Sequence, residues 1–86
     1  MFTDIQSTRA DSLKAFGLLK RSTSEAGIID ERTKELINFS LVIFSKCEPC
    51  IKLHWGKALS MGISEEELDE AAWCAIAMGG APIKMF

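Results

Sequence analysis

The chain has 86 residues, 48% of them hydrophobic, and a formal net charge of −2. Ten basic residues face twelve acidic ones and form no basic stripe, so we expect no binding to nucleic acid. The most apolar stretches, residues 39–44 and 71–78, are far shorter than the roughly 20 residues of a spanning helix, which argues against membrane insertion. The first residues lack the charged and apolar regions of a signal peptide, and we therefore expect a cytoplasmic location.

The length fits a single domain over residues 1–86, and a domain of this size hides only part of its apolar surface. The mean hydropathy of +0.13 indicates more apolar surface than a small monomer can easily bury. We therefore expect a homo-oligomer. No stretch alternates apolar and polar residues at period two, so the predicted fold class is all-α.

The first predicted helix covers residues 12–21, where apolar side chains recur at helical spacing. Gly27 is expected to end it in a left-handed cap. Asp30 is a good N-cap for a second helix, which is predicted from Glu31 to about Ser45. Since this second helix is apolar on nearly every side, we expect it to be buried in the core or by a neighbouring subunit.

Pro49 suits the first position of a third helix, because its missing N–H needs no partner there. This helix is predicted to reach Met61, with Gly62 as the left-handed residue after it. Ser64 and Glu67 form a capping box for a fourth helix. A Gly-Gly pair and a proline then leave room for only a short final segment. The predicted packing face of the fourth helix consists of Leu68, Ala71, Ala72, Ala75 and Ile76.

A close cysteine pair, Cys47 and Cys50, stands at the predicted start of the third helix. The thiolate is the reactive form of cysteine, and a helix N-terminus favours it. The two-residue spacing also lets the two sulfurs approach closely enough for a disulfide. His54 follows Cys50 by four residues and so shares its helix face, where it can accept a proton from the thiol or stabilise the thiolate. In a compartment that keeps thiols reduced, such a pair indicates redox or metal chemistry.

Three interpretations of this motif are open. The pattern favours a redox-active dithiol, because reactive thiols gather at helix starts. In the second, both cysteines are core residues and His54 is a surface residue. In the third, Cys47, Cys50 and His54 are zinc ligands, although the sequence offers no obvious fourth ligand. We expect neither a metal nor a cofactor.

Other polar and aromatic residues carry weaker signals. Glu35 lies in the polar first part of the second helix, and the local pattern indicates a solvated side chain paired with a neighbouring basic residue. Cys74 lies among apolar neighbours, which is typical of a buried cysteine that acts as a small hydrophobe. Trp55 and Trp73 are interpreted as packing residues.

Several motifs follow one another in order between Asp30 and Pro82: Thr33-Lys34-Glu35-Leu36-Ile37, Cys47-x-x-Cys50-x-x-x-His54, Ala58, Gly62, Glu65-Glu66-Glu67 and Met78-Gly79-Gly80-Ala81-Pro82. With these motifs, the segment resembles the alkylhydroperoxidase D-like core of the carboxymuconolactone decarboxylase superfamily. The resemblance implies an all-α helical bundle core of about four to five helices that assembles into homotrimers or homohexamers.

The resemblance also implies roles for four residues. Cys50 matches the thiol that attacks a peroxide and passes through a sulfenic acid, and Cys47 matches the thiol that donates a proton and then closes the disulfide. His54 and Glu35 match the members of a proton relay. Pro49 stands where the best-studied peroxidases of the family carry histidine.

The expected function is therefore that of an enzyme, a thiol-dependent peroxidase or disulfide reductase. Its expected partners are a peroxide or disulfide substrate and an external dithiol or thioredoxin-like reductant. The alternatives are a non-catalytic, redox-sensing oligomeric adaptor and a zinc-binding protein.

Overall fold

The computed structural model describes residues 9–85, which form the helices α2 (Ala10–Ser24), α3 (Glu31–Phe44), α4 (Glu48–Ser60), α5 (Glu65–Gly79) and α6 (Ala81–Lys84). These residues contain no strand, so the predicted all-α class is confirmed. None of the described helices combines the length and the apolar character that a membrane span requires. The expected lack of a signal peptide concerns residues 1–8, which lie outside this range.

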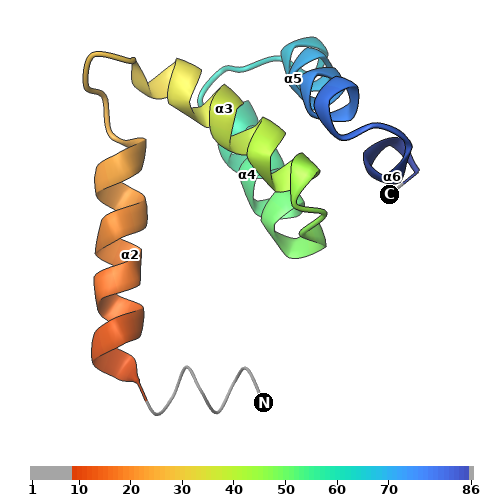
Figure 1. Cartoon of the computed structure of the whole chain (residues 1–86). Coiled ribbons are helices and arrows are strands. Elements are labelled where there is room, and N and C mark those ends of the chain that lie inside the picture. The colour runs from red at the N-terminus through yellow and green to blue at the C-terminus, as the bar shows by residue number, and fades with distance from the viewer. Residues whose placement is uncertain (1–8, 86) are drawn as a thin grey trace.

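The helices form a packed unit with one outlying member. Figure 1 shows α3 beside α4, with α5 and α6 next to them, whereas α2 extends away from the rest. The radius of gyration is 14.4 Å, compared with about 12 Å for a compact chain of this length. The extended position of α2 accounts for this difference.

The start of α3 is fixed by its own N-cap. The Asp30 carboxylate accepts a hydrogen bond from the backbone N–H of Thr33 at 2.7 Å, as predicted. The helix ends at Phe44, one residue before the predicted boundary. Lys46 then adopts the left-handed conformation, with φ of 59°, and the chain turns back into α4. This turn brings the cysteine motif to the start of α4.

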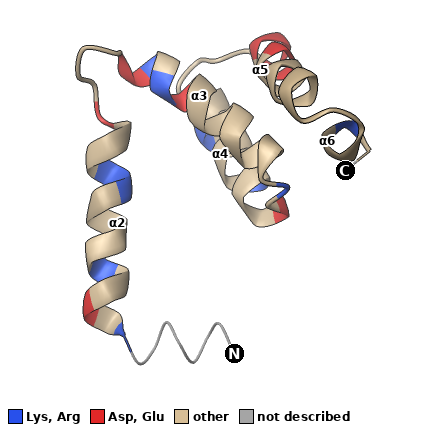
Figure 2. Ribbon diagram, in the orientation of Figure 1, with Lys and Arg blue, Asp and Glu red and all other residues tan. Residues whose placement is uncertain are grey.

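The turn between α4 and α5 confirms the predicted capping signals. Gly62 is left-handed, with φ of 85°, and the N–H of Ile63 donates to the carbonyl of Ala58 at 3.1 Å. The Ser64 hydroxyl accepts from the N–H of Glu67, and the Glu67 carboxylate accepts from the N–H of Ser64, which completes the capping box. Acidic positions gather at this helix start (Figure 2), where the helix dipole favours negative charge.

The core lies where α3, α4 and α5 meet. Phe39, Ala58, Ile63 and Leu68 form its buried cluster, and Trp55 packs on Phe39 with a distance of 6.0 Å between ring centroids. The predicted packing face of α5 is confirmed, because its five residues are all buried or half-buried. The central helix α3 is only partly covered, since Ile37, Leu41 and Phe44 are exposed.

Helix α2 differs from its prediction in length and in its ending. It covers Ala10–Ser24 and so continues through Ser22 and Thr23, whose hydroxyls donate to the carbonyl of Leu19. It ends in an extended Glu25, so the expected left-handed cap at Gly27 is wrong. No residue of α2 is buried. Its exposed apolar side chains are Leu13, Phe16, Leu18 and Leu19.

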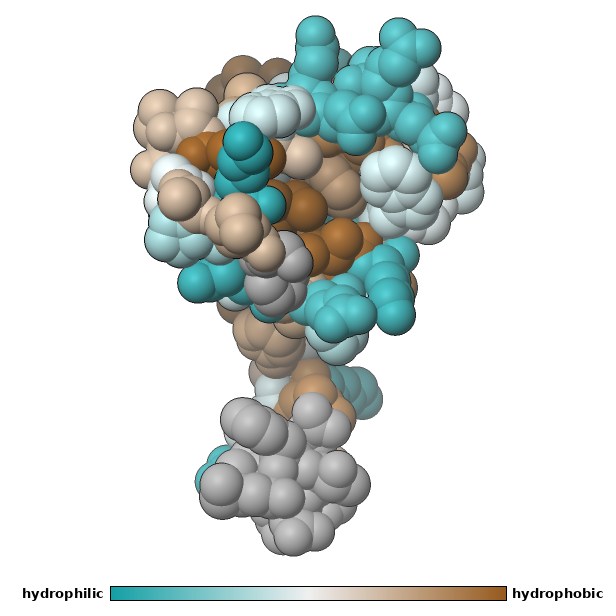
Figure 3. Space-filling model, turned by 90° about the vertical axis from the view of Figure 1, so that its right-hand side faces the viewer, coloured by the Kyte–Doolittle hydropathy of each residue, from teal (hydrophilic) through white to brown (hydrophobic). Residues whose placement is uncertain are grey.

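Two expectations for α5 are also wrong. Cys74 is an exposed free cysteine, and Trp73 has 57% of its surface exposed. The helical period explains both findings, since Leu68 and Ala75 point to the core while positions 73 and 74 lie on the other side of the helix. Apolar side chains are therefore open to solvent on several surfaces, and Figure 3 shows one face where they gather within a hydrophilic rim.

Candidate functional site

The cysteine motif forms the start of α4. Cys47 is the N-cap residue, Cys50 is the third residue of the helix, and a disulfide joins them with 5.2 Å between their Cα atoms. The helix begins at Glu48, so Pro49 takes its second position instead of the predicted first. At this position the missing N–H of proline still leaves no intrahelical bond unmade. The two cysteines are half-buried and bonded to each other, which differs from the interpretation as two core thiols.

A buried carboxylate faces α4 from the neighbouring helix. Glu35 of α3 is only 2% exposed, and its Oε2 lies 2.7 Å from Nδ1 of His54. Its other oxygen, Oε1, lies 3.4 Å from Nζ of Lys57. The local interpretation of Glu35 as a solvated residue is wrong. The nearby basic residues of α3 have other partners, since Lys34 donates to the Glu25 carbonyl and Arg32 to Glu67.

Burial makes the contacts of this carboxylate energetically important. A buried charge without partners is costly, and removing one partner of a buried pair typically costs about 3–5 kcal/mol. Oε1 of Glu35 accepts no hydrogen bond from any described residue, so the ion pair with Lys57 is its compensation. When Nδ1 of His54 carries the ring proton, it donates to Glu35, and Nε2 is then free to accept a proton.

One face of α4 carries the residues that bear on the chemistry. His54 and Lys57 follow Cys50 by four and seven residues, which are helical spacings that keep all three on one side. Sequence reasoning missed Lys57. The helical spacing that places His54 on the same face as Cys50 also places Lys57 there. This spacing does not reveal that the Glu35 side chain of α3 is buried against that face.

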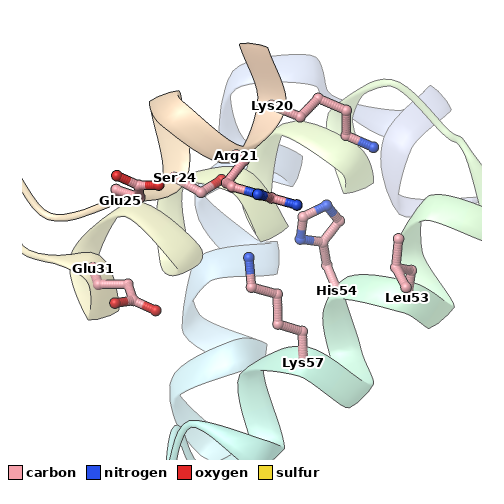
Figure 4. A pocket seen from close by; sticks show the side chains of 8 residues that line it. All are labelled: Lys20, Arg21, Ser24, Glu25, Glu31, Leu53, His54 and Lys57. Carbon is pink, nitrogen blue, oxygen red and sulfur yellow. The ribbon is translucent and has the colours of Figure 1, made fainter. Parts of the chain in front are cut away.

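A pocket of about 360 Å³ opens beside His54, between α2 and α4 (Figure 4). Sequence reasoning did not predict it, because its two walls come from helices whose relative placement no local pattern specifies. The only weak signal was the adjacent basic pair near the end of α2. The residues that line the pocket are Lys20, Arg21, Ser24, Glu25, Glu31, Leu53, His54 and Lys57.

Two acidic groups away from the cysteine motif have lowered pKa values, and both lie at helix starts. A hydrogen bond from Arg32, supported by the backbone N–H of Ser64, lowers the pKa of Glu67 to about 2. Hydrogen bonds from Thr33 lower the pKa of Asp30. Both carboxylates take part in helix caps, and we therefore assign them to stability instead of chemistry.

The zinc interpretation finds no support in the geometry. Within residues 9–85, no group of three or more His, Cys, Asp or Glu side chains is arranged to hold a metal ion. Cys47 and Cys50 bond each other, and Nδ1 of His54 contacts Glu35.

Comparisons with known proteins give a consistent assignment. A family model described as "Carboxymuconolactone decarboxylase family" matches residues 10–85. A curated protein of Paracoccus denitrificans, "Uncharacterized protein 4 in cox locus", is 34% identical over 64 residues. These residues are 74% of this chain, and the match spans 58% of the length of that relative.

Solved structures share the fold, and two of them are described as carboxymuconolactone decarboxylase family proteins. A carboxymuconolactone decarboxylase family protein from Legionella pneumophila, in its apo form, superposes with a TM-score of 0.84 at 28% identity, over 98% of this chain and 75% of that one. A family member from Thermotoga maritima, described as "possibly involved in antioxidative response", has a TM-score of 0.78 at 30% identity, over 84% and 74%. A protein from Methanobacterium thermoautotrophicum has a TM-score of 0.72 at 30% identity, over 99% and 93%.

Proposed function

Because the chain belongs to the carboxymuconolactone decarboxylase family, we propose that it is a thiol-dependent peroxidase or disulfide reductase that works through the Cys47–Cys50 dithiol. One observation carries the proposal: the disulfide lies at the start of α4, one turn before a histidine whose ring contacts a buried glutamate. The antioxidative role suggested for the Thermotoga maritima relative supports the same class of chemistry.

The proposed reaction starts from the reduced dithiol. The Cys50 thiolate attacks a peroxide, so that a sulfur–oxygen bond forms and the O–O bond breaks. The leaving oxygen takes a proton and departs as an alcohol or water, and Cys50 is oxidised to a sulfenic acid. The Cys47 thiol then attacks that sulfur, which forms the disulfide and releases water. An external dithiol or a thioredoxin-like protein restores both thiols by exchange and is itself oxidised to a disulfide.

Cys50 is proposed as the attacking thiol because its helix position favours the charged form. It lies in the first turn of α4, where the positive end of the helix dipole stabilises a thiolate. His54 is proposed to take the proton of this thiol on Nε2, and Glu35 to stabilise the resulting imidazolium through Nδ1. A carboxylate that orients a histidine in this way is a common device in enzymes.

The test is peroxide consumption by the purified protein with a dithiol donor. We expect turnover in the wild type and its loss in the Cys50→Ser variant. Cys74→Ser is the matched control, because this exposed cysteine lies on α5 outside the dithiol, and it should leave the rate unchanged. Equal turnover in wild type and Cys50→Ser refutes the proposal. A disulfide that forms and is reduced without turnover favours the redox-sensing adaptor instead.

We also infer that copies of the chain associate, as homotrimers or homohexamers. The exposed apolar residues of α2 lie on a helix that buries nothing in its own protomer. A second apolar surface is the pocket of about 320 Å³ between α3 and α5, which is lined by Ser40, Leu41, Phe44, Cys74, Ala75 and Met78. Apolar side chains that gather on an exposed surface are typical of a protein–protein interface. The cytoplasm, where thiols are kept reduced, is the proposed location.

A further inference from the structure

The pocket between α2 and α4 is lined by His54, the proposed proton acceptor, and by residues of α2 that the thiol chemistry proposed above does not use. We propose that it binds the carboxylate of a small organic ligand, the substrate or the reductant of the dithiol. This inference rests on the proposed function only for the reaction that follows binding. The binding itself is argued from the side chains that line the pocket.

The cationic side chains of the pocket include two without acidic partners. Lys20 and Arg21 take part in none of the ion pairs formed by residues 9–85, whereas Lys57 shares its charge with Glu35. Figure 4 shows the nitrogens of Lys20, Arg21 and Lys57 around the His54 ring. The carboxylates of Glu25 and Glu31 lie at the other end of the view. The side of the pocket next to His54 therefore carries two cations without acidic partners, although the whole chain carries a net charge of −2.

The placement of the charges, not their sum, suits the pocket to an anion. The three cations of the pocket are matched in number by Glu25 and Glu31 in its wall and by Glu35 behind it. An anion placed beside Lys20 and Arg21 gains their attraction, because neither side chain is paired with a carboxylate. A carboxylate also fits the planar fork of an arginine side chain, which can bind both of its oxygens.

The face of α4 sets the length of the proposed ligand. Cys50 and Lys57 are seven residues apart on this face, which corresponds to roughly 10 Å along the helix axis. Leu53 lies between them, lines the pocket and is 62% exposed. A molecule whose carboxylate lies near Arg21 and Lys57 can therefore run an apolar chain over Leu53 and present a peroxide, disulfide or dithiol at Cys50.

Binding can be tested without any reaction, because His54 is the single histidine of the chain. The imidazole resonances of His54 in a two-dimensional ¹H–¹⁵N spectrum of the oxidised protein can follow titrations with octanoate and with octanamide. These two ligands share the alkyl chain, and only octanoate is charged. We expect octanoate to bind about tenfold more tightly, as for one charge-assisted hydrogen bond. In Arg21→Gln, the preference should fall about fivefold, while Lys52→Gln, an exposed change on α4 outside the pocket, should leave it unchanged.

Three results overturn the inference: equal affinity for the acid and the amide, binding of neither, or a preference that survives in both Arg21→Gln and Lys20→Gln. Inorganic phosphate that competes as well as octanoate also contradicts it, since phosphate has no apolar chain to lie over Leu53. The helical circular dichroism of both variants verifies that α2 is retained. Glutamine is a good helix former at these exposed positions, so we expect no loss.

A second measurement connects the pocket to the dithiol. Dihydrolipoate and dihydrolipoamide carry the same dithiol and differ in a carboxylate, and their rates of reducing the Cys47–Cys50 disulfide can be compared. We expect the acid to react about fivefold faster, with the difference lost in Arg21→Gln. If octanoate is preferred but the protein does not turn over peroxide, the pocket binds carboxylates and the proposed peroxidase is refuted. If peroxide is turned over without any preference for a carboxylate, the proposed function holds and the inference about the pocket is refuted.

Discussion

Helices α2 and α5 have the same length, 15 residues, and both carry apolar side chains, yet only α5 belongs to the core. Leu68 and Ala75 of α5 are buried against the other helices, whereas α2 buries none of its residues. An apolar helix face therefore indicates that a partner exists without identifying it. For α5 the partner is the central helix α3 of the same chain, and for α2 we place it in another copy.

The two helices also differ in how their ends are fixed. The Ser64–Glu67 capping box satisfies backbone groups at the start of α5, while the N-cap of α2, Arg9, makes no side-chain capping bond. Helices of this length are marginal in water without packing or capping. Helix α5 thus obtains its stability from this chain, and we propose that α2 obtains its packing from another copy.

The largest expected effect concerns the proton relay between α3 and α4, a function that α2 does not share. We expect His54→Ala to slow the reaction of Cys50 with peroxide by about 10²–10⁴-fold, because it removes the proposed proton acceptor. Glu35→Gln should act in the same direction with a smaller loss. The measurements are peroxide turnover and the pH profile of Cys50 alkylation. Lys14→Gln, an exposed change on α2, is the control. Wild-type profiles in folded variants refute the relay.

The second effect compares the stability that each helix contributes. We expect Leu68→Ala to lower the free energy of unfolding by about 2–5 kcal/mol, because it leaves a cavity in the buried core cluster. Leu19→Ala makes the same chemical change on α2, where the side chain is 56% exposed, and should cost under about 0.5 kcal/mol in a protomer without partners. Denaturant unfolding at several protein concentrations measures both. Comparable losses at low concentration contradict the contrast between the helices.

The third effect tests the partner proposed for α2. We expect the pair Phe16→Glu and Leu19→Glu to weaken association at least tenfold, or by about 1.4 kcal/mol or more, because it puts charges on an apolar face. Light scattering should then show mass moving toward 9.5 kDa. As the matched control, Lys14→Glu adds negative charge elsewhere on α2 and should leave the mass nearly unchanged. If the pair retains the wild-type mass, α2 is not an interface.

The smallest effect concerns the cap of α5 and depends on pH. The pKa of Glu67 is lowered to about 2, so its contribution to stability is complete above its ordinary value of 4.5 and is lost as the pH falls toward 2. We expect the free energy of unfolding of Glu67→Gln to fall less over this range than that of the wild type. Asp30, whose pKa is also lowered, causes part of the remaining decrease. Parallel acid profiles contradict this assignment.

Much of the fold can be predicted from the sequence because its signals are local. The N-cap at Asp30, the left-handed Gly62 and the capping box at Ser64 each depend on residues within one turn. The errors at Gly27 and Cys74 have physical reasons as well. Serine and threonine are only moderately unfavourable in a helix, so α2 continues past its expected end. Apolar neighbours in sequence do not reveal which side of a helix faces the core.

The candidate site was only partly accessible to such reasoning. The spacing of Cys47, Cys50 and His54 is local, and it pointed to one helix start. The burial of Glu35 and its contact with Lys57 depend on how α3 packs against α4, and only family resemblance drew attention to Glu35. The cationic pocket depends on the placement of α2, which no local pattern determines.

The buried Glu35 has a consequence for how α4 settles on α3 as the chain folds. Its carboxylate is compensated only when His54 and Lys57 both face it. Sliding α4 by one residue presents Leu53 or Trp55 in place of His54 and leaves a charge in an apolar contact. Two helices that pack only through apolar side chains tolerate such a shift of register easily, whereas a single buried charge makes the shift unfavourable. Glu35 therefore favours one register of α4 on α3 over its neighbours.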